Sequence, residues 1–246
     1  MINISKEMRV GDIAVRNTAL RKIFEQYGID FCCKGEQPLD TAAAKKGIPI
    51  KELLNRLNEA ANIPNDSGSK EKNWAAVQLS ELIDYIVSHH HGYLKENLPM
   101  IQQLIEKVLN AHAQNHAVML TTVQQTFGEL YREIDQHLQK EESILFPLVK
   151  SMESYNDHGG DKPQSSCGSV KSIISQMKTE HESAGNALEK LRLTTSDYTL
   201  PQDACASFSG LFQDLQQLEK DLHEHINLEN NLLFSKSIDL ENSLFK

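Results

Sequence analysis

Residues 135–146 read DQHLQKEESILF, and residues 222–234 read LHEHINLENNLLF. The two segments share one pattern, in which a histidine lies four residues before a glutamate and an aliphatic pair and a phenylalanine follow. On a helix, residues four apart lie on one face about a turn apart, so each copy can direct an imidazole and a carboxylate at the same point. Iron and manganese suit that mixed donor set. The segments therefore predict two walls of a metal site, whose ligands would be His137, Glu141, His225 and Glu229.

The duplication extends upstream of both segments. A predicted helix that carries His91 precedes the first segment, and one that carries His181 precedes the second. The spacing to the downstream histidine is 46 positions in the first half and 44 in the second. Two such helix pairs, related by a pseudo-twofold axis, would bring four imidazoles and two carboxylates into a bundle core. This donor count predicts two metal ions with two histidines each, bridged by the two glutamates.

Other interpretations of these residues are weaker. A single helical histidine is usually a solvated side chain, but His137 and His225 continue apolar stripes, where a charge without a metal or partner costs several kcal/mol. Zinc hydrolysis is the competing chemistry, because His and Glu also bind zinc. A symmetric, carboxylate-bridged set in a helical bundle favours redox-active iron instead. On a regular helix His90 points elsewhere if His91 faces inward. Glu180, beside His181, is a candidate for proton handling.

The sequence predicts an all-α protein of two parts. A small helical module covers residues 1–63, a polar linker rich in breakers covers 64–77, and a four-helix bundle covers 78–246. Helices of the module are expected at 14–27, at 39–46 and from Pro49 onward. Helices of the bundle are expected at 78–110, 115–152, 170–193 and from Pro201 onward, with the first connection near residues 111–114. Short connections favour antiparallel neighbours.

Composition narrows the class of partner and the compartment. The chain of 246 residues carries a net charge of −9 and no cluster of Lys and Arg, which argues against nucleic acid or an anionic membrane as the main partner. The N-terminus lacks the apolar core of a secretory signal, and no apolar run has membrane-spanning length. No two of the four cysteines are spaced C-x-x-C. We therefore expect a reduced, cytoplasmic protein.

Taken together, these motifs resemble one family, the hemerythrin-like iron–sulfur cluster repair di-iron proteins, also called repair-of-iron-centres proteins. The resemblance includes His91, both His-x-x-x-Glu segments, EHESAG at 180–185 and, near the N-terminus, IDFCCKG at 29–35. It covers nearly the whole chain, with both modules in the expected order. Two positions depart from the family pattern, since Lys34 stands where Gly is usual and Ser235 where Pro is usual.

The resemblance implies a non-haem di-iron centre, in which two iron ions are bridged by an oxo or hydroxo group and by carboxylates. The terminal ligands would be His91, His137, His181 and His225, and the bridging ligands Glu141 and Glu229. It also implies a cytoplasmic homodimer that acts on damaged iron–sulfur proteins, with nitric oxide or oxygen as a small ligand. Clusters damaged by nitric oxide or peroxide would be restored by iron donation, by nitric oxide reduction at the centre, or by both.

The vicinal cysteines Cys32 and Cys33 have two interpretations. They could pack as small apolar groups, or they could handle iron, nitric oxide or electrons as thiolates, and we favour the second. The alternative function is a hemerythrin-like carrier or sensor of oxygen or nitric oxide, without turnover. The cysteine module favours a repair protein, because a carrier or sensor needs only the bundle. A zinc-dependent hydrolase is a weaker third hypothesis. Cys167 and Cys205 receive no role.

Overall fold

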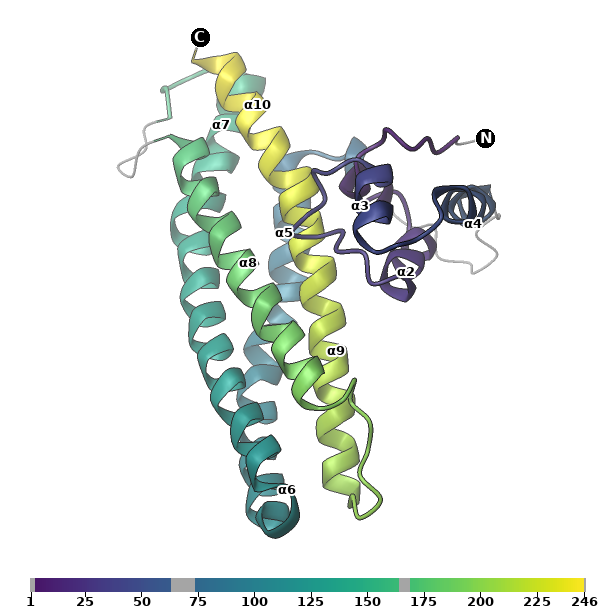
Figure 1. Cartoon of the computed structure of the whole chain (residues 1–246). Helices are drawn as coiled ribbons and strands as arrows, with labels where there is room; N and C mark the ends of the chain where they lie inside the picture. Colours follow the sequence, from purple (N-terminus) through teal and green to yellow (C-terminus); the bar gives the residue numbers. More distant parts are fainter. Residues whose placement is uncertain (1–2, 63–73, 164–168, 246) are drawn as a thin grey trace. The chain divides into compact units, whose positions relative to one another are not determined.

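The computed structural model describes residues 3–62, 74–163 and 169–245, which form helices and short connections without any strand (Figure 1). The predicted all-α class, a helical bundle preceded by a small helical module, is confirmed. None of the described helices combines the length and the apolar character needed to cross a membrane. Residues 64–73 of the predicted linker and Cys167 lie outside the described residues.

The chain divides into two compact units. One comprises residues 83–225, and the other comprises residues 1–82 together with residues 226–246. Residues 83–225 include most of the four rods of the helical bundle, and the other unit contains the N-terminal module, the first residues of the first rod and the C-terminal helix. A short 3₁₀ turn, η1 (Trp74–Ala76), precedes the first rod.

Each rod of the bundle is built from one or more helical segments (Figure 1). The first rod consists of α5 (Leu79–Ile86), η2 (Val87–His91) and the first arm of α6 (Gly92–Lys140). The second consists of the other arm of α6, η3 (Glu141–Leu145) and α7 (Phe146–His158). The third is α8 (Val170–Thr194), and the fourth is α9 (Ala206–Leu228). α7 thus continues beyond residue 152, where the sequence predicts its end.

The core of the bundle follows the predicted helical spacing. Buried apolar residues three and four positions apart line both arms of α6. These are Leu94, Leu98, Ile101, Ile105 and Val108 in the first arm, and Leu120, Val123, Phe127, Leu130 and Ile134 in the second. Burial of such stripes between neighbouring rods supplies most of the stability of a helical bundle.

The turn between the two arms of α6 lies at His116, not at residues 111–114 as predicted. His116 has non-helical backbone angles, with φ −127° and ψ 19°. Its Nε2 atom lies 2.8 Å from Oδ1 of Asp203, and Asn115 donates to Oδ2 of the same carboxylate at 2.9 Å. A contact from the loop between α8 and α9 therefore holds the turn in place, and local composition carries no signal for it.

The fourth rod begins at Ala206 rather than at Pro201, so this prediction was wrong. Residues 196–198 all adopt left-handed backbone angles, with φ between 51° and 56°. The ring of Tyr198 is buried, and its hydroxyl donates a hydrogen bond to Oε2 of Glu219 at 3.0 Å. This anchored turn carries the chain past the end of α8, and the next helix starts only after it.

Residues 3–62, the described part of the N-terminal module, form four short helices. They are α1 (Val10–Ala14), α2 (Thr18–Gln26), α3 (Leu39–Lys45) and α4 (Ile50–Asn62). The single helix predicted at 14–27 is interrupted, because the Asn17 side chain caps α2 by accepting a hydrogen bond from the Leu20 N–H at 2.9 Å. The core of the module consists of fully buried apolar side chains, among them Phe24, Leu39, Leu53 and Leu57.

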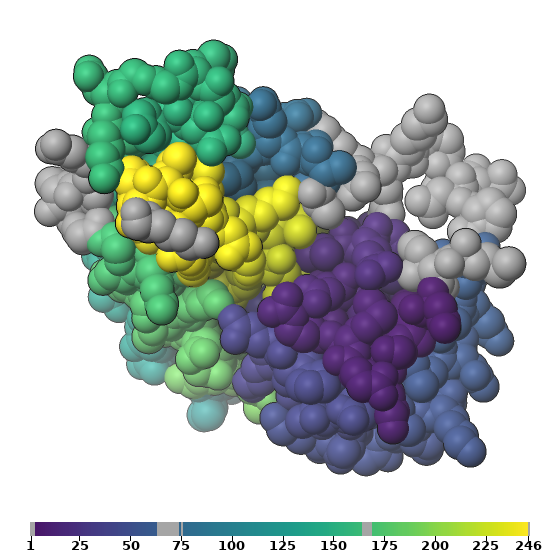
Figure 2. All heavy atoms as spheres, turned by 90° about the horizontal axis from the view of Figure 1, so that it is seen from above, coloured from purple at the N-terminus to yellow at the C-terminus, as the bar shows by residue number. Residues whose placement is uncertain are grey.

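The loop that carries the vicinal cysteines packs against the C-terminal helix of the same unit. This helix contains η4 (Glu229–Leu233) and α10 (Phe234–Leu244), coloured yellow beside the purple N-terminal residues in Figure 2. Asn230 Nδ2 donates to the Cys32 carbonyl at 3.0 Å, and Asn231 Nδ2 donates to the Phe31 carbonyl at 3.0 Å. Two hydrogen bonds therefore tie the cysteine loop to the residues that directly follow Glu229.

Gly11 lies against this contact, and Gly11→Ala is expected to destabilise the protein. An ideal Cβ at position 11 would lie 2.1 Å from Oδ1 and 2.4 Å from Cγ of Asn231. Asn231 also donates to Asn227 Oδ1, so it cannot move without losing hydrogen bonds. Overpacking of this kind costs about 1–3 kcal/mol. Denaturant unfolding measures the loss.

The matched control is Gly128→Ala in α6, where an added Cβ meets no atom within 4 Å. A Gly-to-Ala change inside a helix should stabilise by roughly 0.5–1 kcal/mol, so the two variants are expected to shift stability in opposite directions. If Gly11→Ala behaved like its control, the packing of Asn231 against α1 would be incorrect.

Candidate metal centre

Among the described residues, three five-residue π segments occur, and each includes a predicted metal ligand. His91 ends η2, Glu141 begins η3, and Glu229 begins η4. A π segment adds one residue to the helix and so changes the direction of the side chains around it, and such segments are frequent at functional sites. Hydrophobic residues that recur every 3.6 positions predict an α-helix but do not reveal a π turn within it, so none of the three segments was predicted.

The first π segment overturns the expectation for His90. Both His90 and His91 are buried, with exposed fractions of 3% and 0%. The wider turn of η2 allows two adjacent imidazoles to face the interior. The His90 ring stacks on the His225 ring, with centroids 5.4 Å apart, and its Nδ1 atom lies 2.9 Å from Oδ1 of Asp221. The buried His90 and the partly exposed Asp221 therefore form a pair that supports one predicted ligand.

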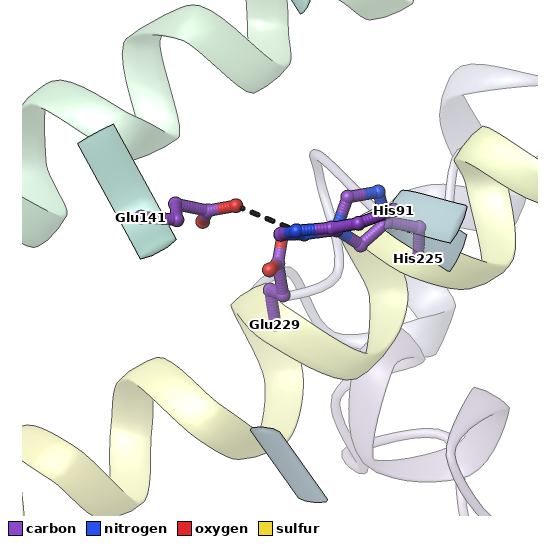
Figure 3. A group of neighbouring side chains, drawn as sticks. All are labelled: His91, Glu141, His225 and Glu229. Carbon is purple, nitrogen blue, oxygen red and sulfur yellow. Dashed lines mark ion pairs between the residues drawn. The ribbon is translucent and has the colours of Figure 1, made fainter. Parts of the chain in front are cut away.

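The structure brings all six predicted ligands together. Every one of them is buried, with at most 3% of its surface exposed. Their donor atoms form two groups, and within each group all atoms lie within 4.8 Å of one another. The first group is His91, Glu141, His225 and Glu229, which converge in Figure 3. The second group is His137, Glu141, His181 and Glu229. Both groups share the same two glutamates, and each has two histidines of its own.

Glu141 faces both groups at once. Its Oε2 atom lies 3.4 Å from His91 Nε2, and its Oε1 atom lies 3.4 Å from His137 Nε2. One oxygen directed at each group is the geometry of a bridging carboxylate. His137 Nε2 and His181 Nε2 are 3.0 Å apart. Two nitrogens bound to one metal at about 2.1 Å and at right angles would be separated by about this distance.

A carboxylate holds the outer nitrogen of His91. The Nδ1 atom lies 2.7 Å from Oε1 of Glu142, which also accepts a hydrogen bond from Lys95 at 2.7 Å. Partial burial alone would raise the pKa of Glu142, but the hydrogen bonds from Lys95 and His91 lower it. An ionised carboxylate accepts the Nδ1 proton and fixes the tautomer, so that the Nε2 lone pair is directed at the centre.

The second rod repeats this arrangement at His137. Its Nδ1 atom lies 2.8 Å from Oε2 of Glu180, and Lys140 and Gln176 donate to Oε1 of the same carboxylate. Partial burial opposes ionisation of Glu180, yet these three hydrogen bonds lower its pKa to about 2. Glu180 is therefore ionised at neutral pH. This favours a role in orienting the imidazole over the predicted role in proton handling.

The donor set fits a pair of divalent cations. Two carboxylates of like charge lie in one buried cluster, and bound cations would offset the free energy of burying them. Imidazole nitrogen with carboxylate oxygen suits iron, manganese or zinc, and neither group includes a thiolate. With four protein donors in each group, an octahedral ion would keep positions for a bridging atom and a small ligand.

Cys32, Cys33 and Asp30 form a separate candidate site. One donor atom from each residue lies within 4.8 Å of the others, and both thiols are reduced, with the sulfurs 3.7 Å apart. The hydrogen bond with Cys33, burial and the Asp30 carboxylate raise the pKa of Cys32 well above its usual range. Cys32 is therefore a thiol at neutral pH, and it would lose its proton on binding a cation.

Asp30 also explains how the turn accommodates Lys34, where the family pattern usually has a glycine. Its Oδ1 atom accepts the backbone N–H groups of Cys32, Cys33 and Lys34, at 3.2, 2.9 and 3.3 Å. Lys34 is not among the described residues with positive φ. The turn therefore does not need a glycine after the two cysteines, because the aspartate organises the backbone instead.

Sequence reasoning missed three residues that contact a predicted ligand or hold a residue that does. They are His90, Glu142 as the acceptor for His91, and Asp221. A local signal exists for Asp221, which precedes His225 by one helical turn and so lies on the same face. The partner of Glu142 comes from another rod, and no pattern within one helix reveals it.

Comparisons with known proteins agree with this geometry. Residues 82–237 match the family model described as the hemerythrin HHE cation binding domain, and residues 6–61 match ScdA_N, described as a domain of unknown function. The chain is 33% identical over 233 residues to a probable iron–sulfur cluster repair protein of Haemophilus influenzae. It is 31% identical to the iron–sulfur cluster repair proteins YtfE of Citrobacter koseri and Escherichia coli. Each alignment covers 95% of this chain and 97% of the relative.

Proposed function

This chain belongs to the family of iron–sulfur cluster repair proteins that carry a hemerythrin HHE cation-binding domain, and we propose that its repair activity depends on two iron ions. One ion would be held by His91 and His225 and the other by His137 and His181, with Glu141 and Glu229 as bridges. The observation that carries this proposal is the pair of donor groups that share both glutamates. The shared glutamates support two adjacent ions, and the family of iron–sulfur cluster repair proteins favours iron over zinc.

When bound, the two ions, with an oxo or hydroxo bridge, would supply one-electron redox chemistry, a position for nitric oxide or oxygen, and iron for a damaged cluster. The chain's own residues prepare the centre for this. Glu142 and Glu180 hold protons at the Nδ1 atoms of His91 and His137 and so orient both imidazoles. Burial of His90 against His225 excludes water from that ligand.

The substrates would be iron–sulfur proteins whose clusters have been damaged by nitrosative or oxidative stress. We assign Cys32 and Cys33, with Asp30, to the transfer of iron or electrons between the centre and these clients. A reducing cytoplasm would keep the vicinal thiols reduced. The homodimer expected from the family resemblance is part of the proposal and rests on that resemblance.

Metal analysis and a repair assay test this proposal together. The protein reconstituted with ferrous iron and exposed to air should hold about two irons per chain and show oxo-bridge absorption. It should also restore activity to a cluster-dependent dehydratase inactivated by nitric oxide. Zinc as the sole metal in protein purified from iron-replete cells would refute the di-iron centre. Two irons without any recovery of the dehydratase would favour the carrier or sensor.

A further inference from the structure

The bundle carries a cysteine, Cys205, that lies outside the candidate metal centre. Cys205 is exposed and directly precedes α9. Its Sγ atom lies 3.2 Å from Nε2 of His112, which comes from the first arm of α6. This contact joins the loop before α9 to a different rod, and none of the residues of the candidate metal centre takes part in it.

Several neighbours favour the thiolate form of Cys205. The largest contribution comes from the His112 imidazole, and the backbone N–H groups of Phe208 and Ser207, in the first turn of α9, add to it. Together they lower the pKa of Cys205 to about 7. A cysteine at a helix N-terminus and beside a histidine is the setting in which thiols become nucleophilic at neutral pH.

The neighbouring side chains hold the His112 ring in place. Its ring packs on Phe208, with centroids 5.1 Å apart. The other ionisable groups of this cluster are His116 and Asp203, which pair with each other at 2.8 Å. Because the four side chains pair two by two and do not converge on one point, the cluster does not make a metal site.

We propose that Cys205 is a nucleophilic site that undergoes exchange with small disulfides and thereby carries a reversible mixed disulfide. The Cys205 thiolate attacks one sulfur of the incoming disulfide, the old S–S bond breaks as the new one forms, and the second half leaves as a thiolate that takes up a proton. One disulfide replaces another, so no further oxidant is needed. The exposed position gives a small disulfide direct access to the sulfur. The reaction would separate Cys205 from His112 and so loosen the link between α6 and the loop before α9.

Site-resolved alkylation of the full-length protein tests the site. Iodoacetamide is applied at a series of pH values, and mass spectrometry of the Cys205 peptide reads the rate. We expect a midpoint near 7 for the wild type. His112→Gln should move the midpoint towards about 8.5, the value of an ordinary thiol, and lower the rate at neutral pH roughly three- to fifteen-fold. His158→Gln, which removes an exposed histidine whose Nδ1 atom lies 3.3 Å from the Ser154 carbonyl oxygen of the same helix, should leave the midpoint unchanged.

Glutathione disulfide is the probe for the exchange itself. At neutral pH it should add one glutathionyl group to the Cys205 peptide, and dithiothreitol should remove it. Far-ultraviolet circular dichroism checks that His112→Gln is folded, and the wild-type profile decides the matter if the variant is not. A wild-type midpoint above about 8, or a Cys205 peptide that glutathione disulfide leaves unmodified, would overturn the proposal.

Discussion

Glu141→Gln is expected to remove both metal ions, although it changes a single atom of one side chain. Glu141 belongs to both donor groups, and each of its oxygens faces a different histidine at 3.4 Å. An amide keeps the size of the side chain but loses its charge and one of its two oxygen donors. Neither ion would then keep a full donor set, and iron content should fall from about two per chain to near zero.

The loss of the metal ions should also lower the thermal stability of the protein. Ligands that bind only the folded state stabilise it by about 2.7 kcal/mol when present at a hundred times their dissociation constant. A chelator should therefore lower the unfolding temperature of the wild type and leave that of Glu141→Gln unchanged. The control is Glu106→Gln, the same change at an exposed position of α6, which should behave like the wild type. Full iron content in Glu141→Gln would show that the glutamate is not a bridge.

Replacing both vicinal cysteines, as Cys32→Ala with Cys33→Ala, is expected to abolish repair while leaving the centre intact. Neither sulfur belongs to the two histidine–glutamate groups, so iron content and oxo-bridge absorption should not change. Recovery of a nitric-oxide-damaged dehydratase should fall by at least about tenfold, because the repair protein would then lack the two thiols that we assign to transfer.

The single variant Cys205→Ser is the matched control for this result. It removes an exposed thiol from the other unit of the chain and should leave repair at the wild-type level. Equal unfolding midpoints of the double variant and the wild type exclude a folding defect as the cause. Full repair by the double variant would mean that the two cysteines serve only to pack the N-terminal loop.

Much of the site could be predicted, because its information is local and occurs twice. A histidine and a glutamate four residues apart share a helical face whatever the helix packs against. The repeat of that pair, with an upstream histidine in each half, predicted the six residues that the structure places in two overlapping groups. The all-α class followed in the same way from apolar stripes and breakers, since both are properties of short segments.

The features that could not be predicted depend on contacts between distant segments or on irregular backbone. The turn at His116 is held by Asp203, and the late start of α9 follows the buried Tyr198. The contacts that hold these turns join residues 87 positions apart for His116 with Asp203 and 21 apart for Tyr198 with Glu219, so composition placed both boundaries a few residues away. The inward direction of His90 depends on a π turn, which hydrophobic periodicity does not encode.

The π segment at residues 141–145 also fixes how the chain tolerates changes in length. On a regular helix each residue advances the side-chain direction by about 100°. The π turn holds one residue more than an ordinary turn, so deleting one residue there would let the backbone relax into a regular helix with α7 in nearly the same register. Val149 and Met152 would then stay buried. A shortened chain would therefore keep the core below the centre, but it would lose the widened turn that Glu141 begins.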